Sequence, residues 1–232
     1  MSSVKIITTS DGSHSLFNEE LNETYHSIHG AIQESVHVFI QSGLTYFIEK
    51  FNPKNVSILE IGFGTGLNAL LTIQAAQQSS SSFQYKTLEA FPLEEEVWSK
   101  LNYADALNLK KDFDSLHRVS WEEQHDITPN FQFQKHHIKL QDVVLKPSSF
   151  DIIFFDAFAP NKQPELWEIV TLKKVTDTLR TNGVFVTYCA KGQLKRDLKS
   201  AGLTVETIPG PPGKKEMVRA VKLFPDHPAN NK

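Results

Sequence analysis

The chain of 232 residues is 40% hydrophobic and carries a formal net charge of -3 at pH 7. This composition excludes a chain that is disordered throughout, and the length accommodates one good-sized domain with a small appendage. No segment approaches the roughly 18 apolar residues that a membrane span needs, and the N-terminus lacks a basic start followed by a long apolar run, so a soluble, unexported protein without membrane contact is predicted.

The cysteine content bears on the cellular compartment, and the charge distribution bears on nucleic-acid binding. Cys189 is the single cysteine, which excludes an intrachain disulfide and a cysteine-based zinc cluster and favours a reducing compartment, the cytoplasm by default. The near-neutral total charge does not support nucleic-acid binding, but residues 191–222 hold eight basic and three acidic residues. Such a segment would attract phosphates, although an ordinary solvated helix face explains it equally well.

Residues 1–50 are predicted to form an N-terminal cap made of a hairpin and a helix. Two β-prone segments, Val4 to Thr9 and His14 to Phe17, flank an Asp-Gly dipeptide that is typical of a hairpin turn. An apolar pattern with helical spacing follows, and Gly43 is expected to break that helix.

A polar cluster in this cap could suggest a metal site; its members are His26, His29, Glu34 and His37. They lack the H-E-x-x-H spacing that places two imidazoles on one helix face beside a catalytic glutamate, and no cysteine assists them. We therefore predict no metal, and interpret the residues as a hydrogen-bonded polar cluster.

The segment VSILEIGFGTGL, Val56 to Leu67, reads as a buried parallel strand, a glycine-rich turn and the start of a helix. Its glycines, Gly62, Gly64 and Gly66, fall at the first, third and fifth positions, whereas the dinucleotide fingerprint requires the first, third and sixth, which argues against NAD. An acid before G-x-G-x-G, here Glu60, is the pattern of S-adenosylmethionine (AdoMet) methyltransferases, which this segment resembles. A glycine-rich turn of another α/β domain remains the alternative.

The next strand is predicted over Gln84 to Leu88, with Glu89 at its carboxyl end. An acid about 20 residues beyond the glycine turn is where a doubly wound fold binds ribose hydroxyls. Helices are expected from about residue 92 to 101 and over most of residues 103–126, followed by a strand over residues 131–140.

Two further acids follow predicted strands. Asp142 comes just after the strand ending at residue 140 and could accept a hydrogen bond from an adenine amino group, although a surface turn would also explain it. In FDIIFFDAFAP, residues 150–160, an apolar run should form a central strand that delivers Asp156 to the ligand-binding edge of the sheet. Phe158 could form an aromatic wall for a flat base beside that carboxylate, whereas Trp167 taken separately is expected to be core.

The C-terminal part is predicted to contain, in order, an Asn182-Gly183 turn, a strand over residues 184–188, a basic helix over 191–201, and closing strands over 203–208 and 216–223. Strands that alternate with helices indicate an α/β fold with a mostly parallel sheet. The predicted main domain spans residues 51–225, and residues 226–232 are predicted to be a disordered tail.

Several segments together resemble one family: ETYHSIHGAIQESVHVFIQSGL, EIGFGTGLN, FFDAFAP with PELW, and GKKEM. The family is that of the bacterial tRNA 5-methylaminomethyl-2-thiouridine methyltransferases, known as MnmD when standalone and as the methyltransferase half of the bifunctional MnmC. The resemblance runs from about residue 11 to residue 221. It implies a Rossmann-like AdoMet-dependent methyltransferase sheet and AdoMet as the cofactor.

The resemblance also implies residue roles. The glycine turn would hold AdoMet, with Glu89 on the ribose and Asp142 near the adenine; the full set of implied cofactor contacts is Glu60, Gly62, Phe63, Gly64, Gly66, Glu89, Asp142 and Asp156. Asp156 would also be the catalytic residue, holding the acceptor amine as hydrogen-bond acceptor and proton acceptor. The predicted substrate contacts are Tyr25, His26, Glu34 and Phe158 in the acceptor pocket, and Lys191, Lys195, Arg196, Lys214 and Lys215 on the phosphates of the tRNA anticodon loop.

The implied reaction is methylation of the aminomethyl nitrogen of 5-aminomethyl-(2-thio)uridine at the wobble position of tRNA. The FAD-dependent oxidase half of the fused members has no room in 232 residues, so another protein would supply the aminomethyl group. Two departures from the family pattern are modest: Asp-Ala-Phe replaces Asp-Gly-Phe, and GKKEM replaces GKREM. Lys215 keeps the charge but lacks the planar fork of arginine, which puts a bidentate phosphate contact there in doubt.

Two alternative functions remain open from the sequence. One is an AdoMet-dependent transferase that acts on a small amine and needs no RNA. The other is a non-catalytic AdoMet-binding partner of a tRNA-modification enzyme, which would bind the cofactor without turnover.

Overall fold

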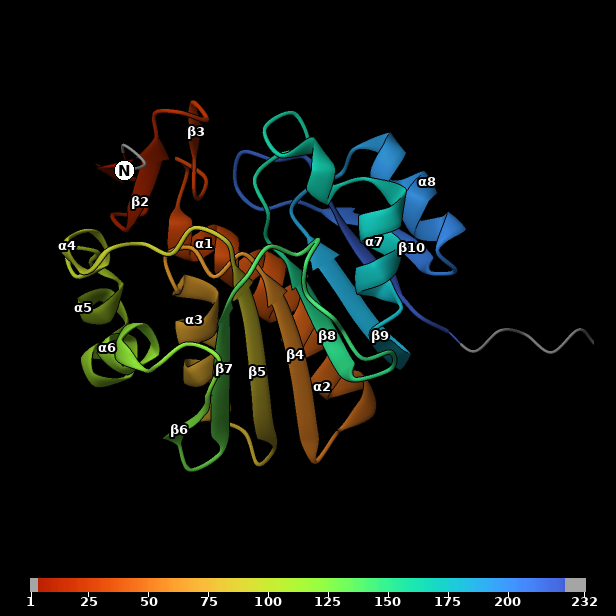
Figure 1. Cartoon of the computed structure of the whole chain (residues 1–232), viewed down its shortest axis with the longest axis horizontal. Helices are drawn as coiled ribbons and strands as arrows, with labels where there is room; N and C mark the ends of the chain where they lie inside the picture. Colours follow the sequence, from red (N-terminus) through yellow and green to blue (C-terminus); the bar gives the residue numbers. More distant parts are fainter. Residues whose placement is uncertain (1–3, 224–232) are drawn as a thin grey trace, which may run out of the picture.

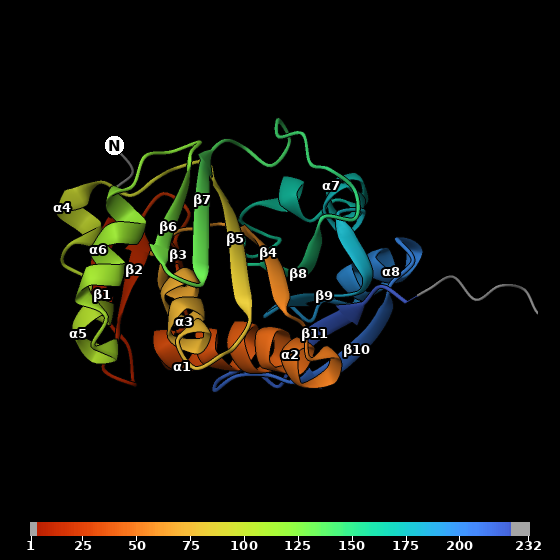
Figure 2. The same ribbon diagram turned by 90° about the horizontal axis from the view of Figure 1, so that it is seen from below.

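The structure, a computed structural model, describes residues 4–223, and the predicted tail at residues 226–232 lies outside the described residues. Figures 1 and 2 show a central sheet with helices on both faces. In spatial order the strands are β10 (Thr204–Pro209), β11 (Glu216–Val221), β9 (Leu179–Thr187), β8 (Phe150–Phe155), β4 (Asn55–Ile61), β5 (Ser82–Glu89), β7 (Phe131–His137) and β6 (Gln124–Thr128). This is the mostly parallel, Rossmann-like α/β architecture that the sequence predicts.

Strand pairing fixes where a ligand can bind. β4, β5, β7, β8 and β9 pair in parallel, whereas β11 is antiparallel to both of its neighbours and β6 is antiparallel to β7. From β4 the chain proceeds outward through β5 and β7, then returns to the other side of β4 with β8 and β9. The strand order therefore reverses between β4 and β8, and the crevice outside their carboxyl ends is the expected ligand site of such a sheet.

The N-terminal segment forms a small antiparallel sheet of β1 (Val4–Thr8), β2 (His14–Asn18) and β3 (Glu23–Thr24). Figure 1 shows it on the side of the central sheet where β4 and β5 end. A helical run follows without interruption, through α1 (Ala31–Ser35), the π-helix η1 (Val36–Thr45) and α2 (Tyr46–Phe51).

The predicted helix break at Gly43 is wrong, and packing explains why glycine is there. A Cβ at Gly43 would lie 2.9 Å from Cγ2 of Val186 and 3.2 Å from Cε1 of Phe154. The missing side chain therefore lets η1 lie directly on β8 and β9. Continuity of the helix is maintained because this close contact offsets the low helix propensity of glycine.

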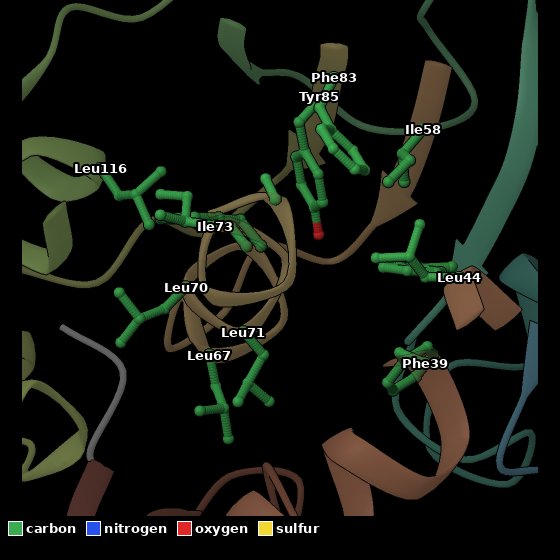
Figure 3. Packing of buried hydrophobic residues seen from close by; sticks show 14 of the residues in the cluster. Phe39, Leu44, Ile58, Leu67, Leu70, Leu71, Ile73, Phe83, Tyr85 and Leu116 are labelled. Carbon is green, nitrogen blue, oxygen red and sulfur yellow. The ribbon is translucent and has the colours of Figure 1, made fainter. Parts of the chain in front are cut away.

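The remaining helices are α3 (Leu67–Ala76), α4 (Glu95–Trp98), α5 (Tyr103–Leu107), α6 (Lys110–Arg118), the 3-10 helix η2 (Pro164–Leu166), α7 (Ile169–Thr176) and α8 (Gly192–Ser200). Figure 3 shows α3 end on, with Leu67, Leu70, Leu71 and Ile73 pointing outward to different neighbours. Residues 67–73 of α3 are all buried, so the first two turns of this helix are enclosed by their neighbours. The glycine turn that precedes α3 is therefore anchored at a rigid element.

Three other sequence predictions need correction. The helix predicted over residues 92–101 is the single turn α4, and the helical stretch of residues 103–126 ends at Arg118, after which β6 begins. β6 is a polar edge strand, so it lacks the apolar alternation that identifies strands in a sequence. Asn182 and Gly183 lie inside β9, where the pairing with β8 is irregular, rather than in a turn before it.

Trp167 is 7% exposed and packs edge-on against Phe155, which confirms the prediction that it belongs to the core. Its indole Nε1 also donates to the carbonyl oxygen of Phe158 at 2.8 Å. Trp167 thereby holds the loop that follows β8.

Within residues 4–223 we find no helix whose length and apolar character would suit a bilayer crossing.

We expect Gly43→Val to lower the free energy of unfolding by about 2–3 kcal/mol, because the added carbons must displace the stiff side chain of Val186 in a packed interface. Urea unfolding measures the difference. Gln41→Val, at an exposed position of the same helix, is the matched control and should change stability by less than about 1 kcal/mol. Equal effects of the two variants would contradict the close-packing argument.

Candidate functional site

A cavity of about 1800 Å³ opens at the carboxyl ends of the central strands. Its walls come from the glycine turn after β4, the ends of β5 and β8, the segment after β7 and residues 23–29 of the N-terminal segment. Typical small-molecule sites occupy about 300–1,000 Å³. This cavity therefore has room for two reactants side by side.

The glycine turn forms one wall with its backbone. Gly62 has a φ of +92°, and a Cβ there would lie 2.7 Å from the carbonyl oxygen of Asp156. Gly64 has a φ of +50° and donates its N–H to Oε2 of Glu89 at 2.8 Å. Glycine is favoured at both positions because residues with a side chain rarely adopt a left-handed backbone. At Gly62 a side chain would also collide with the backbone of Asp156.

Glu89 is oriented at the end of β5 by two backbone donors. Besides Gly64, the N–H of Phe91 donates to Oε1 at 2.8 Å, and the side chain lines the cavity. Asp142, exposed on the segment after β7, lines the same cavity. Phe63 lines it as well, and its ring packs against His117 and Phe133.

Glu60 is not among the residues that line the cavity, and its predicted contact with the cofactor stays a prediction. Its side chain is fully buried beneath the cavity, close to Thr87, Asn68 and Tyr85. The reason is strand alternation, because Ile61 and Glu60 point to opposite faces of β4 and only Ile61 lines the cavity. Burial raises the pKa of the Glu60 carboxyl well above its ordinary value.

Asp156 lies at the carboxyl end of β8, where its backbone N–H donates to the carbonyl oxygen of Ile61 at 3.0 Å. Nδ2 of Asn68 donates to its Oδ2 at 2.8 Å. Burial, followed by the negative charge of Glu34, raises the pKa of Asp156 to about 7, against the opposing effects of the Asn68 hydrogen bond and Lys214. The carboxyl group can therefore accept or release a proton near neutral pH.

Glu34 and Lys214 form an ion pair in the wall near Asp156, with Nζ of Lys214 2.6 Å from Oε1 of Glu34. The other oxygen of Glu34 accepts the backbone N–H of Ser27 at 2.7 Å, and Nζ of Lys214 lies 3.9 Å from the ring centroid of Tyr188. The predicted acceptor-pocket residue Glu34 and the predicted phosphate-binding residue Lys214 are thus brought together.

Tyr25, His26 and Phe158 also line the cavity. Tyr25 packs edge-on against Phe158, with ring centroids 4.9 Å apart, and lies against Gly64. A 2.7 Å hydrogen bond joins Nε2 of His26 to Oγ1 of Thr65 in the glycine turn. Burial lowers the pKa of His26 to about 4, so its imidazole is neutral at pH 7.

The other predicted phosphate contacts lie outside the cavity wall. Lys195 pairs with Glu216 at 3.2 Å, and Arg196 donates to the side chain of Gln193 at 2.7 Å, both on or beside α8. Lys191 and Lys215 are exposed. Within residues 4–223, no three His, Cys, Asp or Glu side chains gather in a way that could hold a metal ion.

Among the cavity residues that were not assigned from the sequence, Asn68 contacts Asp156 and Tyr188 contacts Lys214. Asn68 comes two residues after the last glycine of the segment EIGFGTGLN, and a polar residue in the first turn of a mostly apolar helix is a signal for it. Tyr188 follows β9 at the same edge of the sheet as Asp156, and its hydroxyl donates to the carbonyl oxygen of Ala157 at 2.9 Å. The rule that pointed to Asp156 would also have found it.

A family model described as "S-adenosyl-L-methionine-dependent methyltransferase" matches residues 95–223, more than half of the chain. The chain belongs to this methyltransferase family. It is an enzyme of that class, with AdoMet as its cofactor.

Curated relatives extend the similarity to most of the chain. The tRNA 5-methylaminomethyl-2-thiouridine biosynthesis bifunctional protein MnmC of Campylobacter hominis is 29% identical over 215 residues, which cover 88% of this chain and 31% of that protein. MnmC of Acinetobacter baylyi is 28% identical over 237 residues, covering 90% and 36%. The chain thus spans about a third of the length of these relatives.

Among solved structures, MnmC2 from Aquifex aeolicus superposes with a TM-score of 0.76 at 24% identity, over 95% of this chain and 70% of that one. The two share a fold. The comparisons therefore confirm the methyltransferase fold and the resemblance to the MnmC methyltransferases.

The cavity fits AdoMet on its own chemistry. A main-chain wall at Gly62 and Gly64 admits the amino acid part, the anchored carboxylate of Glu89 can accept hydrogen bonds from a ribose diol, and Asp142 can accept one from an exocyclic amine. Gly66 supports this wall indirectly, because a Cβ there would meet His117 Nε2 at 2.9 Å.

Removing Glu34 and removing Lys214 should shift the pKa of Asp156 in opposite directions. Glu34→Gln deletes the charge that raises the pKa of Asp156 and leaves Lys214 to lower it, so the pKa of Asp156 should fall below 7. Lys214→Met should raise it. A ¹³C NMR titration of the carboxyl carbons, with the Asp156 signal assigned from Asp156→Asn, measures both; shifts of the same sign would contradict the electrostatic argument.

Proposed function

We propose that this enzyme transfers a methyl group from AdoMet to the aminomethyl nitrogen of 5-aminomethyl-(2-thio)uridine at the wobble position of tRNA. The observation that carries the proposal is Asp156, a carboxyl group with a pKa near 7, at the junction of the cofactor turn and a wall built from Tyr25 and Phe158. Similarity to MnmC over most of the chain supports the same substrate. A carboxylate between aromatic rings suits a flat base that carries an amine.

The acceptor amine must be neutral to attack, so one proton has to leave it. Asp156 accepts that proton, and Asn68 holds the receiving carboxylate in position. Bound AdoMet supplies a methyl group already activated by its sulfonium. Most of the rate gain assigned to the protein therefore comes from placing the nitrogen in line, a task for Tyr25 and Phe158 on one side and the glycine turn on the other.

Residues 1–50 act as a cap over the acceptor in this proposal, while residues 51–225 form the methyltransferase domain. Two contacts of the described part support the cap: the hydrogen bond of His26 with Thr65, and the ion pair of Glu34 with Lys214. The wobble base would be splayed out of the anticodon loop to reach the cavity, as single-stranded RNA bases can be. An activity elsewhere would supply the aminomethyl group.

The assignment of Lys214 is revised accordingly. Because it pairs with Glu34 in the cavity wall, it belongs to the acceptor pocket rather than to a phosphate-binding surface. The basic residues left to contact tRNA phosphates lie on or beside α8 and in the loop between β10 and β11, namely Lys191, Lys195, Arg196 and Lys215.

We expect Asp156→Asn to lower the rate of methyl transfer at least about a hundredfold, because the proton acceptor is lost. The assay follows labelled methyl from AdoMet into the wobble uridine of tRNA isolated from cells that lack this methylation. AdoMet affinity, measured by calorimetry, shows whether cofactor binding survives. The variant should be at least as thermally stable as the parent at pH 8. A carboxyl whose pKa is raised by folding costs stability progressively as pH rises from its ordinary value of 3.8 to the raised value of about 7, and at pH 8 the full cost is present.

Asp151→Asn is the matched control for Asp156→Asn. Asp151 lies on the same strand, β8, at the opposite end, where it accepts from the N–H of Ser57 and from Arg180. Its substitution should leave methyl transfer unchanged. Label transferred to small amines but not to tRNA would favour the small-amine transferase instead, and AdoMet binding without any turnover would favour the non-catalytic partner.

The exposed basic residues give a separate expectation. The double substitution of Lys191 and Lys215 by Met should raise KM for tRNA several-fold with little change in kcat, and should flatten the salt dependence of binding, because phosphate contacts release counterions. Lys54→Met with Lys111→Met, two exposed lysines outside this surface and outside the cavity wall, is the comparison. A loss confined to kcat would contradict a phosphate-binding role.

A further inference from the structure

A buried polar cluster lies directly beneath Asp156, and the mechanism above does not use all of it. Glu60 is 0% exposed at the end of β4. Thr87 and Tyr85 on β5 and Asn68 on α3 stand around its carboxyl group, and the charge of Asp156 also acts on it. These groups share one enclosed space between β4, β5 and α3.

Several polar atoms of this cluster form no direct hydrogen bond with any described residue. Five buried atoms have no direct hydrogen-bond partner there: both carboxyl oxygens of Glu60, Oδ1 of Asn68, the hydroxyl of Tyr85 and Oγ1 of Thr87. Asn68 is satisfied on its other side, where Nδ2 donates to Asp156. Buried polar groups are rarely left unpaired, so the protonation state of Glu60 matters.

An ionised Glu60 would be an acceptor only. It could receive the hydroxyls of Tyr85 and Thr87, but Oδ1 of Asn68, also an acceptor, would stay unpaired beside a negative charge. A protonated Glu60 has one O–H to donate, and Oδ1 of Asn68 is the neighbouring acceptor in need of a donor. The carbonyl oxygen of the protonated acid can still receive the two hydroxyls, so this state pairs every member of the cluster.

We propose that Glu60 is a positioning residue that stays protonated and donates its O–H to Oδ1 of Asn68, thereby fixing the amide so that Nδ2 faces Asp156. Without that donor the two ends of the amide are interchangeable, and Oδ1 could turn toward the carboxylate of Asp156. The inference rests on the proposed role of Asp156 in proton transfer. It assigns the acid of the glycine-turn motif to the acceptor side of the reaction rather than to the cofactor.

Glutamine tests this assignment because its amide can donate to Oδ1 of Asn68 and carries no charge. We expect Glu60→Gln to retain kcat within about threefold, whereas Glu60→Met, apolar and similar in length, should lower kcat at least about tenfold with little change in KM. The pKa of Asp156 should stay the same in Glu60→Gln. It should rise in Glu60→Met, because a weakened hydrogen bond from Asn68 no longer favours the charged form.

The pKa of Asp156 is read from ¹³C NMR titration without any tRNA. The inference is therefore tested even if tRNA proves not to be the substrate, which the parent enzyme's failure to label tRNA would reveal separately. Asp151→Asn again serves as control, with no expected change in kcat or in the titration. A loss in Glu60→Gln as large as in Glu60→Met, or a fall in the pKa of Asp156 there, would show a charged Glu60 and overturn the proposal.

A double-mutant cycle separates positioning from a general structural effect. If Glu60 acts through Asn68, Glu60→Met should add nothing to the loss that Asn68→Leu alone produces. If the loss of kcat in the double variant equals the product of the losses in the two single variants, Glu60 acts by a route that does not involve Asn68. If Glu60→Met does not fold, as judged by circular dichroism, the comparison of parent, Glu60→Gln and Asn68→Leu still decides the matter by kcat and by titration.

Discussion

The contact between the ends of β4 and β8 is the constraint on which the site depends. The N–H of Asp156 bonds to the carbonyl of Ile61, and Gly62 passes so close to the carbonyl of Asp156 that a Cβ would lie 2.7 Å away. Parallel pairing of these central strands brings the cofactor turn and the acid together at the point where strand order reverses. Any side chain at Gly62 would separate them.

Rigid surroundings make this contact precise. Residues 67–73 of α3 are all buried, so the turn that leads into this helix has little freedom, and Trp167 ties the loop after Asp156 to the core. The positions of both reactants are thereby set by strand ends and a buried helix rather than by loops. A site built in this way can hold an in-line geometry because its supports are themselves packed.

How far the sequence predicts this arrangement depends on the range of the interactions. The glycine turn and Asp156 were predictable because an apolar strand followed by glycines or by an acid is a local pattern. The ion pair between Glu34 and Lys214 joins residues 180 positions apart, and no local pattern encodes it. The break predicted at Gly43 was wrong because the residue that this glycine packs against, Val186, is distant in the sequence and no local pattern reveals the contact.

Charge at the site explains why a buried acid would suit the amine acceptor of the proposed reaction. With Asp156 ionised, Glu34, Lys214 and Asp156 together carry one negative charge, which the cationic amine of the proposed acceptor would neutralise on entry. An ordinary aspartic acid is a weak base toward an alkylammonium ion, but raising its pKa from 3.8 to about 7 reduces the cost of proton transfer by roughly 4 kcal/mol before the charge of the acceptor acts on it. The burial that raises the pKa of Asp156 therefore lowers the stability of the fold. The same raised pKa makes the carboxylate a stronger base, as the proposed proton transfer requires.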